Sequence, residues 1–296
     1  MKSGMRFTSS SGWIVTSAKC STRVHFRDCA WQAILSEIIV GDAFGVDRMD
    51  YLLRDSHHAG VAYGRFDHYR LVDTLRILPT APSGEGEESK EAALGVEEGG
   101  IQSAEALMLA HYFMYSQVYF HPIRRIYDLH LMEFLVEWLP GRTFSTDVHQ
   151  HLRYTDNEVT AALLAAATDV GKAGHMHAGR IIRREHFKVL YARNPDHVKI
   201  NPEAGNAVFC ALSTQFGAEY FRHDRYHQGT GPPDFPVRLR DGQIVSSLAV
   251  SETLNHVPVV SVDTVFADRS ILSKANEWLR TNRADIVRPK READHG

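Results

Sequence analysis

The sequence contains few cysteines and no long apolar stretch. Its 296 residues include three cysteines, Cys20, Cys29 and Cys210, an odd number without C-x-x-C spacing. This pattern argues against a disulfide framework and favours a reducing compartment. Spanning a bilayer takes roughly 20 consecutive apolar residues, and no stretch approaches that length. The first residues show no apolar segment followed by a signal-peptide cleavage site. We therefore expect a soluble, cytoplasmic protein.

An excess of one charge is also lacking. The chain has 33 Lys and Arg residues against 36 Asp and Glu residues, a formal charge of −3. It therefore has no general basic field for nucleic acid or an anionic membrane, and an anionic ligand would need a local basic site. The sequence contains no P-loop, G-x-G-x-x-G or G-x-S-x-G motif. This argues against the nucleotide-binding and hydrolase folds that these motifs define.

Helical patterns fill most of the first half of the chain. Apolar residues recur at helical spacing in residues 31–39, 46–58, 65–78 and 105–139, with a turn at residues 41–45 between the first two. Within the longest pattern, Pro122 predicts a kink or a break. Residues 92–104 contain a glycine pair between short apolar segments, which predicts a β-hairpin.

The second half of the chain is mixed. Thr155 and Glu158 form a capping-box signature that predicts a helix start. Residues 234–251, which include an Asp-Gly turn, and residues 257–267 alternate in the manner of strands. The 44% hydrophobic content permits a large core. We expect a mainly α protein: a partial helical core with a small α+β C-terminal part.

The composition divides the chain into three parts. Residues 1–30, rich in Ser and Thr, form a poorly specified lead-in. Residues 31–145 form the helical core, with an acidic, Pro/Gly-rich loop at 79–91. Residues 146–296 form a helical region followed by the α+β region.

Residues 45–60, GVDRMDYLLRDSHHAG, carry an unusual polar stripe. A helix advances about 100° per residue, which places polar and ionisable side chains on one side and apolar ones on the other. A solvated helix face is one explanation. The stripe lacks lysine and mixes short carboxylates with Tyr and His, which favours ligation or recognition instead. Its members are Asp47, Asp50, Tyr51, Arg54, Asp55 and His58.

A second stripe lies on the longest helical pattern. His111, Tyr115 and Tyr119 are spaced four residues apart, and Arg124 and Arg125 follow them. An aromatic core helix with satisfied polar tips would explain the spacing. The number of polar tips favours a pocket shared with the first stripe.

The residues in these stripes resemble a known family. GVDRMDYLLRDSHHAGV, RFDHYRLVDTLRIL and MYSQVYFH are similar to segments of the HD-domain phosphohydrolases, in the branch that contains dNTP triphosphohydrolases. The resemblance covers residues 31–139 and continues less distinctly into DFPVRLRDG. It implies a helical HD-type core that hydrolyses a nucleotide or related phosphoester with a divalent metal, and that often assembles into homo-oligomers.

The resemblance also implies roles for individual residues. Asp47 matches the last metal ligand of the family's H…HD…D set, and Arg48 a phosphate contact. Tyr51 matches a nucleotide contact, Asp55 a sugar-hydroxyl contact and Tyr119 a tyrosine of the nucleoside pocket.

Two further stripe residues, His111 and Tyr115, are candidates for substrate binding. His111 stands where relatives usually have Arg, which weakens the implied phosphate clamp.

The chain departs from the family at the metal ligands. No H…HD pattern precedes Asp47, where His25 stands isolated, and no catalytic residue is identified. The dipeptide His223–Asp224 follows out of family order, so we interpret it as coincidental surface chemistry. A single carboxylate cannot hold a catalytic metal. We expect Mn, Mg, Ni, Fe or Zn to bind weakly, and interpret the chain as the C-terminal part of an HD phosphohydrolase from a truncated or degenerate gene.

Two functions therefore remain open. One is a metal-dependent phosphohydrolase, and the other is a non-catalytic remnant that binds nucleotide or a partner subunit. A core without its first helices would expose Leu52, Leu53, Phe113 and Met114, which predicts self-association. His175 and His177, two residues apart, follow a spacing that is common by chance in a chain with 17 histidines, and we predict no metal site there.

Overall fold

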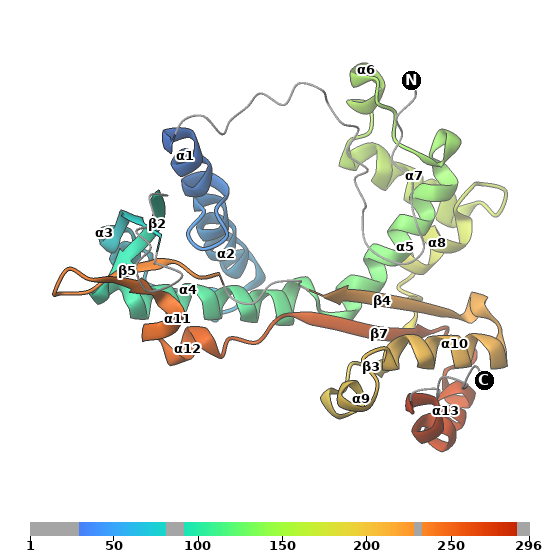
Figure 1. The fold of residues 1–296 in the computed structure, drawn as a ribbon. Helices are drawn as coiled ribbons and strands as arrows, with labels where there is room; N and C mark the ends of the chain where they lie inside the picture. Colours follow the sequence, from blue (N-terminus) through green and yellow to red (C-terminus); the bar gives the residue numbers. More distant parts are fainter. Residues whose placement is uncertain (1–29, 81–91, 228–232, 289–296) are drawn as a thin grey trace, which may run out of the picture. The chain divides into compact units, whose positions relative to one another are not determined.

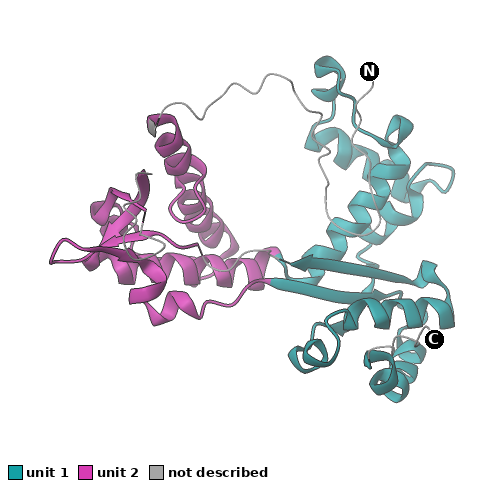
Figure 2. Cartoon of the chain, in the orientation of Figure 1, with its two compact units in different colours: residues 1–19, 120–227, 261–296 teal, residues 20–119, 228–260 magenta. Residues whose placement is uncertain are grey.

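The computed structural model describes residues 30–80, 92–227 and 233–288 (Figure 1). Most of the predicted lead-in and of the acidic loop lies outside these residues. Two compact units interleave along the chain (Figure 2). The described part of unit 1 comprises residues 120–227 and 261–288, and that of unit 2 comprises residues 30–119 and 233–260 without the gap at 81–91. The predicted division at residues 30 and 145 stays a prediction.

Unit 2 combines helices with a small mixed sheet. In the sheet order β1-β2-β5-β6, the outer pairs are antiparallel and the central pair is parallel. An Asp-Gly turn with Gly242 at φ 88° joins β5 to β6, as the sequence predicts. The elements are α1 Ala30–Val40, α2 Val46–Ala59, α3 His68–Thr74, β1 Leu75–Pro79, β2 Ala92–Glu97, α4 Ile101–Met114, the π-helical turn Tyr115–Tyr119, β5 Pro236–Arg238, β6 Ile244–Ser246, α11 Ser247–Val250 and α12 Glu252–Asn255.

The core of unit 2 forms where α2 packs on α4. Leu52 and Met114 are fully buried there, so the prediction that the chain would expose them is wrong. The two helices cover each other's apolar faces. Phe113 remains 41% exposed, as predicted. Helix α1 instead exposes four large apolar side chains, Trp31, Leu35, Ile39 and Val40.

Two local predictions in this unit are wrong. The helix predicted for residues 65–78 ends at Thr74, and β1 follows it directly. The predicted hairpin at 92–104 is absent, because β2 pairs with β1 and the glycine pair leads into α4. A Cβ atom at Gly100 would overlap the Thr74 side chain. The glycine therefore serves a close approach between segments rather than a turn between strands.

Unit 1 places helices around a three-stranded antiparallel sheet of order β3-β7-β4. Pro122 occupies the first turn of α5, which confirms the predicted break. The capping box of Thr155 and Glu158 is present at the start of α7. The elements are α5 Pro122–Trp138, α6 Val148–His151, α7 Asp156–Thr168, α8 His175–Ile182, β3 Lys188–Ala192, α9 Pro195–Ile200, α10 Ala204–Phe216, β4 Phe221–His227, β7 Ser261–Ala267 and α13 Leu272–Val287.

These elements confirm the predicted fold class, a mainly α protein with a small α+β part. Helix α8 packs on both α5 and α7. Phe134 of α5 and Ala178 of α8 are fully buried in the resulting cluster. Within the described part of the chain, no helix has the length and apolar character needed to cross a membrane.

Candidate functional site

The two predicted polar stripes meet in unit 2. The Tyr119 hydroxyl donates a hydrogen bond to Oδ2 of Asp55 at 2.7 Å. The Tyr51 and Tyr115 hydroxyl oxygens lie 3.4 Å apart, at the long end of a hydrogen bond. The structure thus gathers one carboxylate and three tyrosines from α2 and the π-helical turn that follows α4.

The π-helical turn accounts for the placement of the tyrosines. Residues 115–119 take this wider winding directly after α4. The rings of Tyr115 and Tyr119 lie 4.9 Å apart and nearly perpendicular, and that of Tyr51 lies 6.1 Å from Tyr119. Edge-to-face packing of this kind fixes ring orientation. Short π-helical segments occur frequently at functional sites.

The hydroxyls of Tyr51 and Tyr119 stay protonated. Burial, followed by the contact with Tyr115, raises the pKa of Tyr51 far above its ordinary 10.0. Burial, followed by the bond to Asp55, raises the pKa of Tyr119 in the same direction. Neither residue therefore serves as an anionic group near neutral pH. The Tyr51 hydroxyl can donate a hydrogen bond to a ligand, whereas the single proton of the Tyr119 hydroxyl is donated to Asp55.

Arg48 supplies a positive charge close to Tyr51 and His111. Its guanidinium donates to the backbone oxygen of Asp42 and lies 3.5 Å from the Asp42 carboxylate. The Asp42 side chain is 94% exposed, so this ion pair contributes little. Because a guanidinium carries five N–H donors, the contact to Asp42 leaves donors for an anion.

His111 carries no charge at neutral pH. Burial, reinforced by the nearby Arg48 charge, lowers its pKa from 6.5 to about 4. Its ring packs on Tyr115 with centroids 4.3 Å apart. A neutral imidazole can bind a phosphate oxygen through one N–H only, and does not replace the forked, charged donor of an Arg.

Asp47 lies in the exposed first turn of α2. Its Oδ1 accepts a bond from the Arg48 backbone N–H at 2.6 Å. Among the described residues, no group of three or more metal-ligating side chains includes Asp47. The residues present therefore do not fit the metal that the family resemblance implies.

The outer part of the first stripe behaves as a solvated helix face. Arg54 pairs with Asp50 at 3.1 Å and with Asp55 at 3.2 Å. The His58 Nδ1 atom lies 2.8 Å from the Arg54 backbone oxygen. Both explanations of the stripe thus apply to different residues: Asp50, Arg54 and His58 form exposed contacts, whereas Tyr51 and Asp55 face the tyrosines.

The His223–Asp224 dipeptide is structural and not a surface feature. Arg125 binds the Asp224 carboxylate through two bonds, of 2.8 Å from Nε and 2.6 Å from Nη2. The Asp224 side chain is only 3% exposed. His223 contacts Asp263 at 2.7 Å. The interpretation as surface chemistry is therefore wrong, because β4 turns Asp224 into unit 1 where Arg125 compensates its charge.

Another polar group was not predicted. His130, Glu133 and His177 bring potential ligand atoms within 4.8 Å of one another in unit 1. The sequence offered one signal, the H-x-x-E spacing of His130 and Glu133 on one helix.

Comparisons with known proteins find similarity to HD-type proteins. Residues 66–206 match the model of the HD associated region. A deoxynucleoside triphosphate triphosphohydrolase of Gallus gallus is 24% identical over 187 residues, which make up 58% of this chain and 29% of that protein. The chain is thus similar to the HD-domain phosphohydrolases.

Uncharacterised proteins are more similar over shorter segments of this HD-type chain. One from Methanocaldococcus jannaschii is 42% identical over 31% of this chain and 18% of its own length. YwfO of Bacillus subtilis is 33% identical over 33% of this chain and 20% of its own length. The chain thus spans less than a third of the length of each of these three relatives.

Solved structures share the fold over most of the HD-type chain. A hypothetical protein from Aquifex aeolicus superposes with a TM-score of 0.69 at 31% identity, covering 85% of this chain and 61% of that one. A phosphohydrolase from Bacteroides thetaiotaomicron superposes with a TM-score of 0.58 at 20% identity, covering 80% and 64%.

Proposed function

We propose that this chain supplies the nucleotide-binding part of an HD-superfamily phosphohydrolase that acts on a nucleotide or a related phosphoester. The observation that carries the proposal is the bond between Tyr119 and Asp55, which joins the two polar stripes. The similarity to a deoxynucleoside triphosphate triphosphohydrolase supports a nucleotide as the ligand.

Each contact in the proposed pocket has its own chemistry. The Asp55 carboxylate accepts hydrogen bonds from sugar hydroxyls, and the Tyr119 ring packs on the nucleoside. Tyr51 donates through its protonated hydroxyl, whose pKa burial keeps high. Arg48 binds a phosphate oxygen with donors that the Asp42 contact leaves over. His111 and Tyr115 contribute neutral surfaces beside the phosphate.

Hydrolysis depends on more than the described residues. In the HD superfamily a divalent metal activates the attacking water, and such an ion needs several ligands. Asp47 alone does not form such a set within the described segments. The proposal for turnover therefore requires ligands in addition to Asp47. Binding without turnover is the second candidate function, and the exposed, isolated position of Asp47 favours it for this chain alone.

The proposal extends to the localisation and the assembly of the protein. The paucity of cysteine favours the cytoplasm. A homo-oligomer is the proposed assembly, because α1 leaves four large apolar side chains exposed on one short helix.

Calorimetric titration of dNTPs and NTPs, with and without Mn²⁺, tests the proposal. Release of phosphate and triphosphate is assayed in parallel. Turnover abolished by Asp47→Ala supports the hydrolase, and binding without turnover supports the remnant. If the wild-type chain binds no nucleotide under any metal condition, the pocket assignment is wrong.

A further inference from the structure

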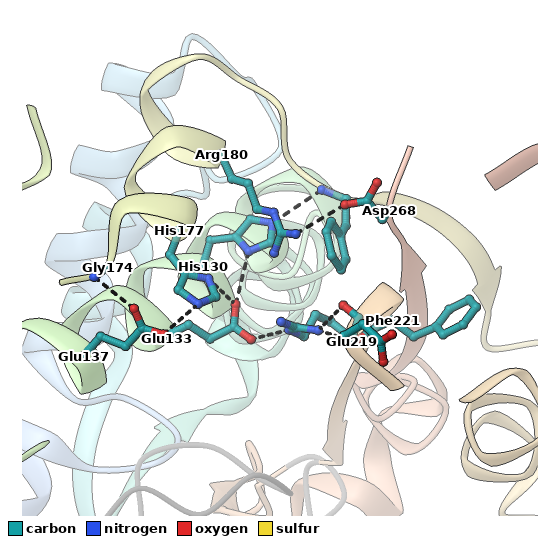
Figure 3. A network of polar contacts seen from close by, with 11 residues as sticks. His130, Glu133, Glu137, Gly174, His177, Arg180, Glu219, Phe221 and Asp268 are labelled. Atoms are coloured by element: carbon teal, nitrogen blue, oxygen red, sulfur yellow. Dashed lines mark hydrogen bonds and ion pairs between the residues drawn. The ribbon is translucent and has the colours of Figure 1, made fainter. Parts of the chain in front are cut away.

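Unit 1 contains a compact group of nitrogen and oxygen ligands that shares no residue with the HD-type site (Figure 3). His130 and Glu133 project from one face of α5, and His177 projects from α8. Glu133 Oε2 lies 3.3 Å from Nδ1 of His130 and 2.9 Å from Nδ1 of His177. The His130 side chain is fully buried, and that of His177 is 12% exposed.

The His177 ring leaves one nitrogen without a hydrogen-bond partner. Its Nδ1 atom is buried and makes no well-aligned hydrogen bond, although Glu133 Oε2 is near. Its Nε2 atom lies 3.5 Å from Glu137 Oε1, and Glu137 is held by the Gly174 backbone N–H at 2.9 Å. With its proton on Nε2, the ring directs that N–H toward Glu137, and the Nδ1 lone pair and Glu133 Oε2 can then bind the same cation.

A metal site uses the same arrangement. Metal-bound histidines usually donate their second N–H to a carboxylate, which sets the tautomer and the ring orientation. Glu137 stands in that position relative to His177 (Figure 3). In a tetrahedral site with bonds of about 2.0–2.1 Å, ligand atoms lie roughly 3.4 Å apart. The three donor atoms, all within 4.8 Å of one another, reach that spacing by small side-chain rotations.

Two arginines lie near the ligand group. Arg222 contacts Oε1 of Glu133 and leaves Oε2 toward the histidines. Arg180, the other nearby cation, pairs with Asp268 at 3.3 Å.

We propose that His130, Glu133 and His177 bind a divalent cation of the Zn²⁺ type, which fastens α8 to α5. Two imidazoles and one carboxylate form a donor set that suits Zn²⁺ and leaves a fourth position for water. His130 binds the ion through Nδ1, the ring nitrogen that faces Glu133. The ring proton then sits on Nε2, which breaks the contact in which Nε2 accepts the Phe187 N–H at 3.4 Å, a distance beyond the usual hydrogen-bond range. The site is separate from Asp47, which belongs to unit 2.

Zinc titration of the full-length chain tests this proposal. The chain is stripped with a chelator, and Zn²⁺ is titrated against a chromophoric competitor. His177→Gln removes one ligand, whereas His175→Gln is the matched control on the same helix, because His175 Nδ1 contacts the Ala166 backbone oxygen instead. Asp47→Ala separates this site from the HD-type site.

The expected result is one equivalent of Zn²⁺ in the wild type, in His175→Gln and in Asp47→Ala. His177→Gln should weaken binding by at least about a hundredfold. Glu137→Gln should weaken it by about 10–100-fold, the usual effect of an outer-shell partner. Equal affinity in His177→Gln and the wild type, or zinc lost only in Asp47→Ala, overturns the proposal, as does a wild type that binds no zinc.

X-ray absorption provides a test that does not depend on the folding of the His177 variant. The spectrum is recorded on the zinc complex of Asp47→Ala. Scattering from at least two imidazoles and an oxygen in the first shell supports the site. A shell with one imidazole or none overturns it.

Discussion

The hydroxyl of Tyr119 donates to the carboxylate of Asp55 at 2.7 Å, across 64 residues of sequence. This bond ties the π-helical turn after α4 to the polar face of α2. It also occupies the carboxylate that we assign to a sugar hydroxyl. A bound nucleotide must therefore share Asp55 with Tyr119 or displace it, which links ligand binding to the position of the tyrosine.

Tyr119→Phe should lower the free energy of unfolding by about 1–2 kcal/mol. The substitution keeps the ring and removes a hydrogen bond to a charged acceptor, whose partial exposure moderates the loss. Tyr51→Phe is the matched control, because its hydroxyl makes the longer contact of 3.4 Å to Tyr115, and the loss of this contact should cost less. Urea denaturation measures both. A larger loss for Tyr51→Phe would contradict the ranking.

Arg48→Ala should weaken nucleotide binding by about one to two decades. A hydrogen bond to a charged group contributes roughly 1.5–3 kcal/mol, and each 1.4 kcal/mol corresponds to tenfold in affinity. Asp42→Asn tests the same contact from the other side. Because it removes a competing anion from Arg48, we expect binding that is equal or tighter. Calorimetry measures both variants, and weaker binding by Asp42→Asn would count against Arg48 as the phosphate contact.

Helical periodicity fixes which residues share a face, and it therefore predicts each of the two polar stripes. Their convergence is an expectation from the number of polar side chains on both segments, and the contact between Asp55 and Tyr119 involves a π-helical turn that periodicity does not predict. The strand β1 could not be predicted in the same way. Leu75 to Leu78 continue the apolar spacing of α3, and only pairing with β2, a contact distant in sequence, turns them into a strand.

The ligand group of unit 1 illustrates the same limit. Periodicity places His130 beside Glu133 on α5, but nothing local connects them with His177. That residue arrives through the packing of α8 on α5. The pattern GHMHAG contains both His175 and His177. In the structure His175 contacts the Ala166 backbone oxygen, whereas His177 lies beside Glu133 in the ligand group.

Asp224→Ala should destabilise the chain by about 3–5 kcal/mol, because it leaves Arg125 without its bidentate partner in a buried setting. Asp128→Ala is the matched control. Asp128 approaches the same arginine at 3.5 Å and is 39% exposed, so its loss should cost less than about 1 kcal/mol. Thermal and urea unfolding of both variants measure the difference. Similar losses would show that Asp224 contributes through packing and not through its charge.

His111 makes the stability of the chain depend on pH on the acid side of neutrality. Burial and Arg48 lower its folded pKa to about 4, against 6.5 in the absence of these effects. Between these values the unfolded chain binds more protons than the folded one, so stability falls as the pH decreases from 6.5 to 4. At 1.36 kcal/mol per pH unit, the contribution of His111 to stability is about 3 kcal/mol at most.

His111→Gln, which does not titrate, should show a shallower decline of the free energy of unfolding, measured with urea, across this pH range. Arg48→Ala should raise the pKa of His111 in an NMR titration, because it removes the neighbouring positive charge. A pH profile unchanged by His111→Gln would show that other groups govern the acid sensitivity of the fold.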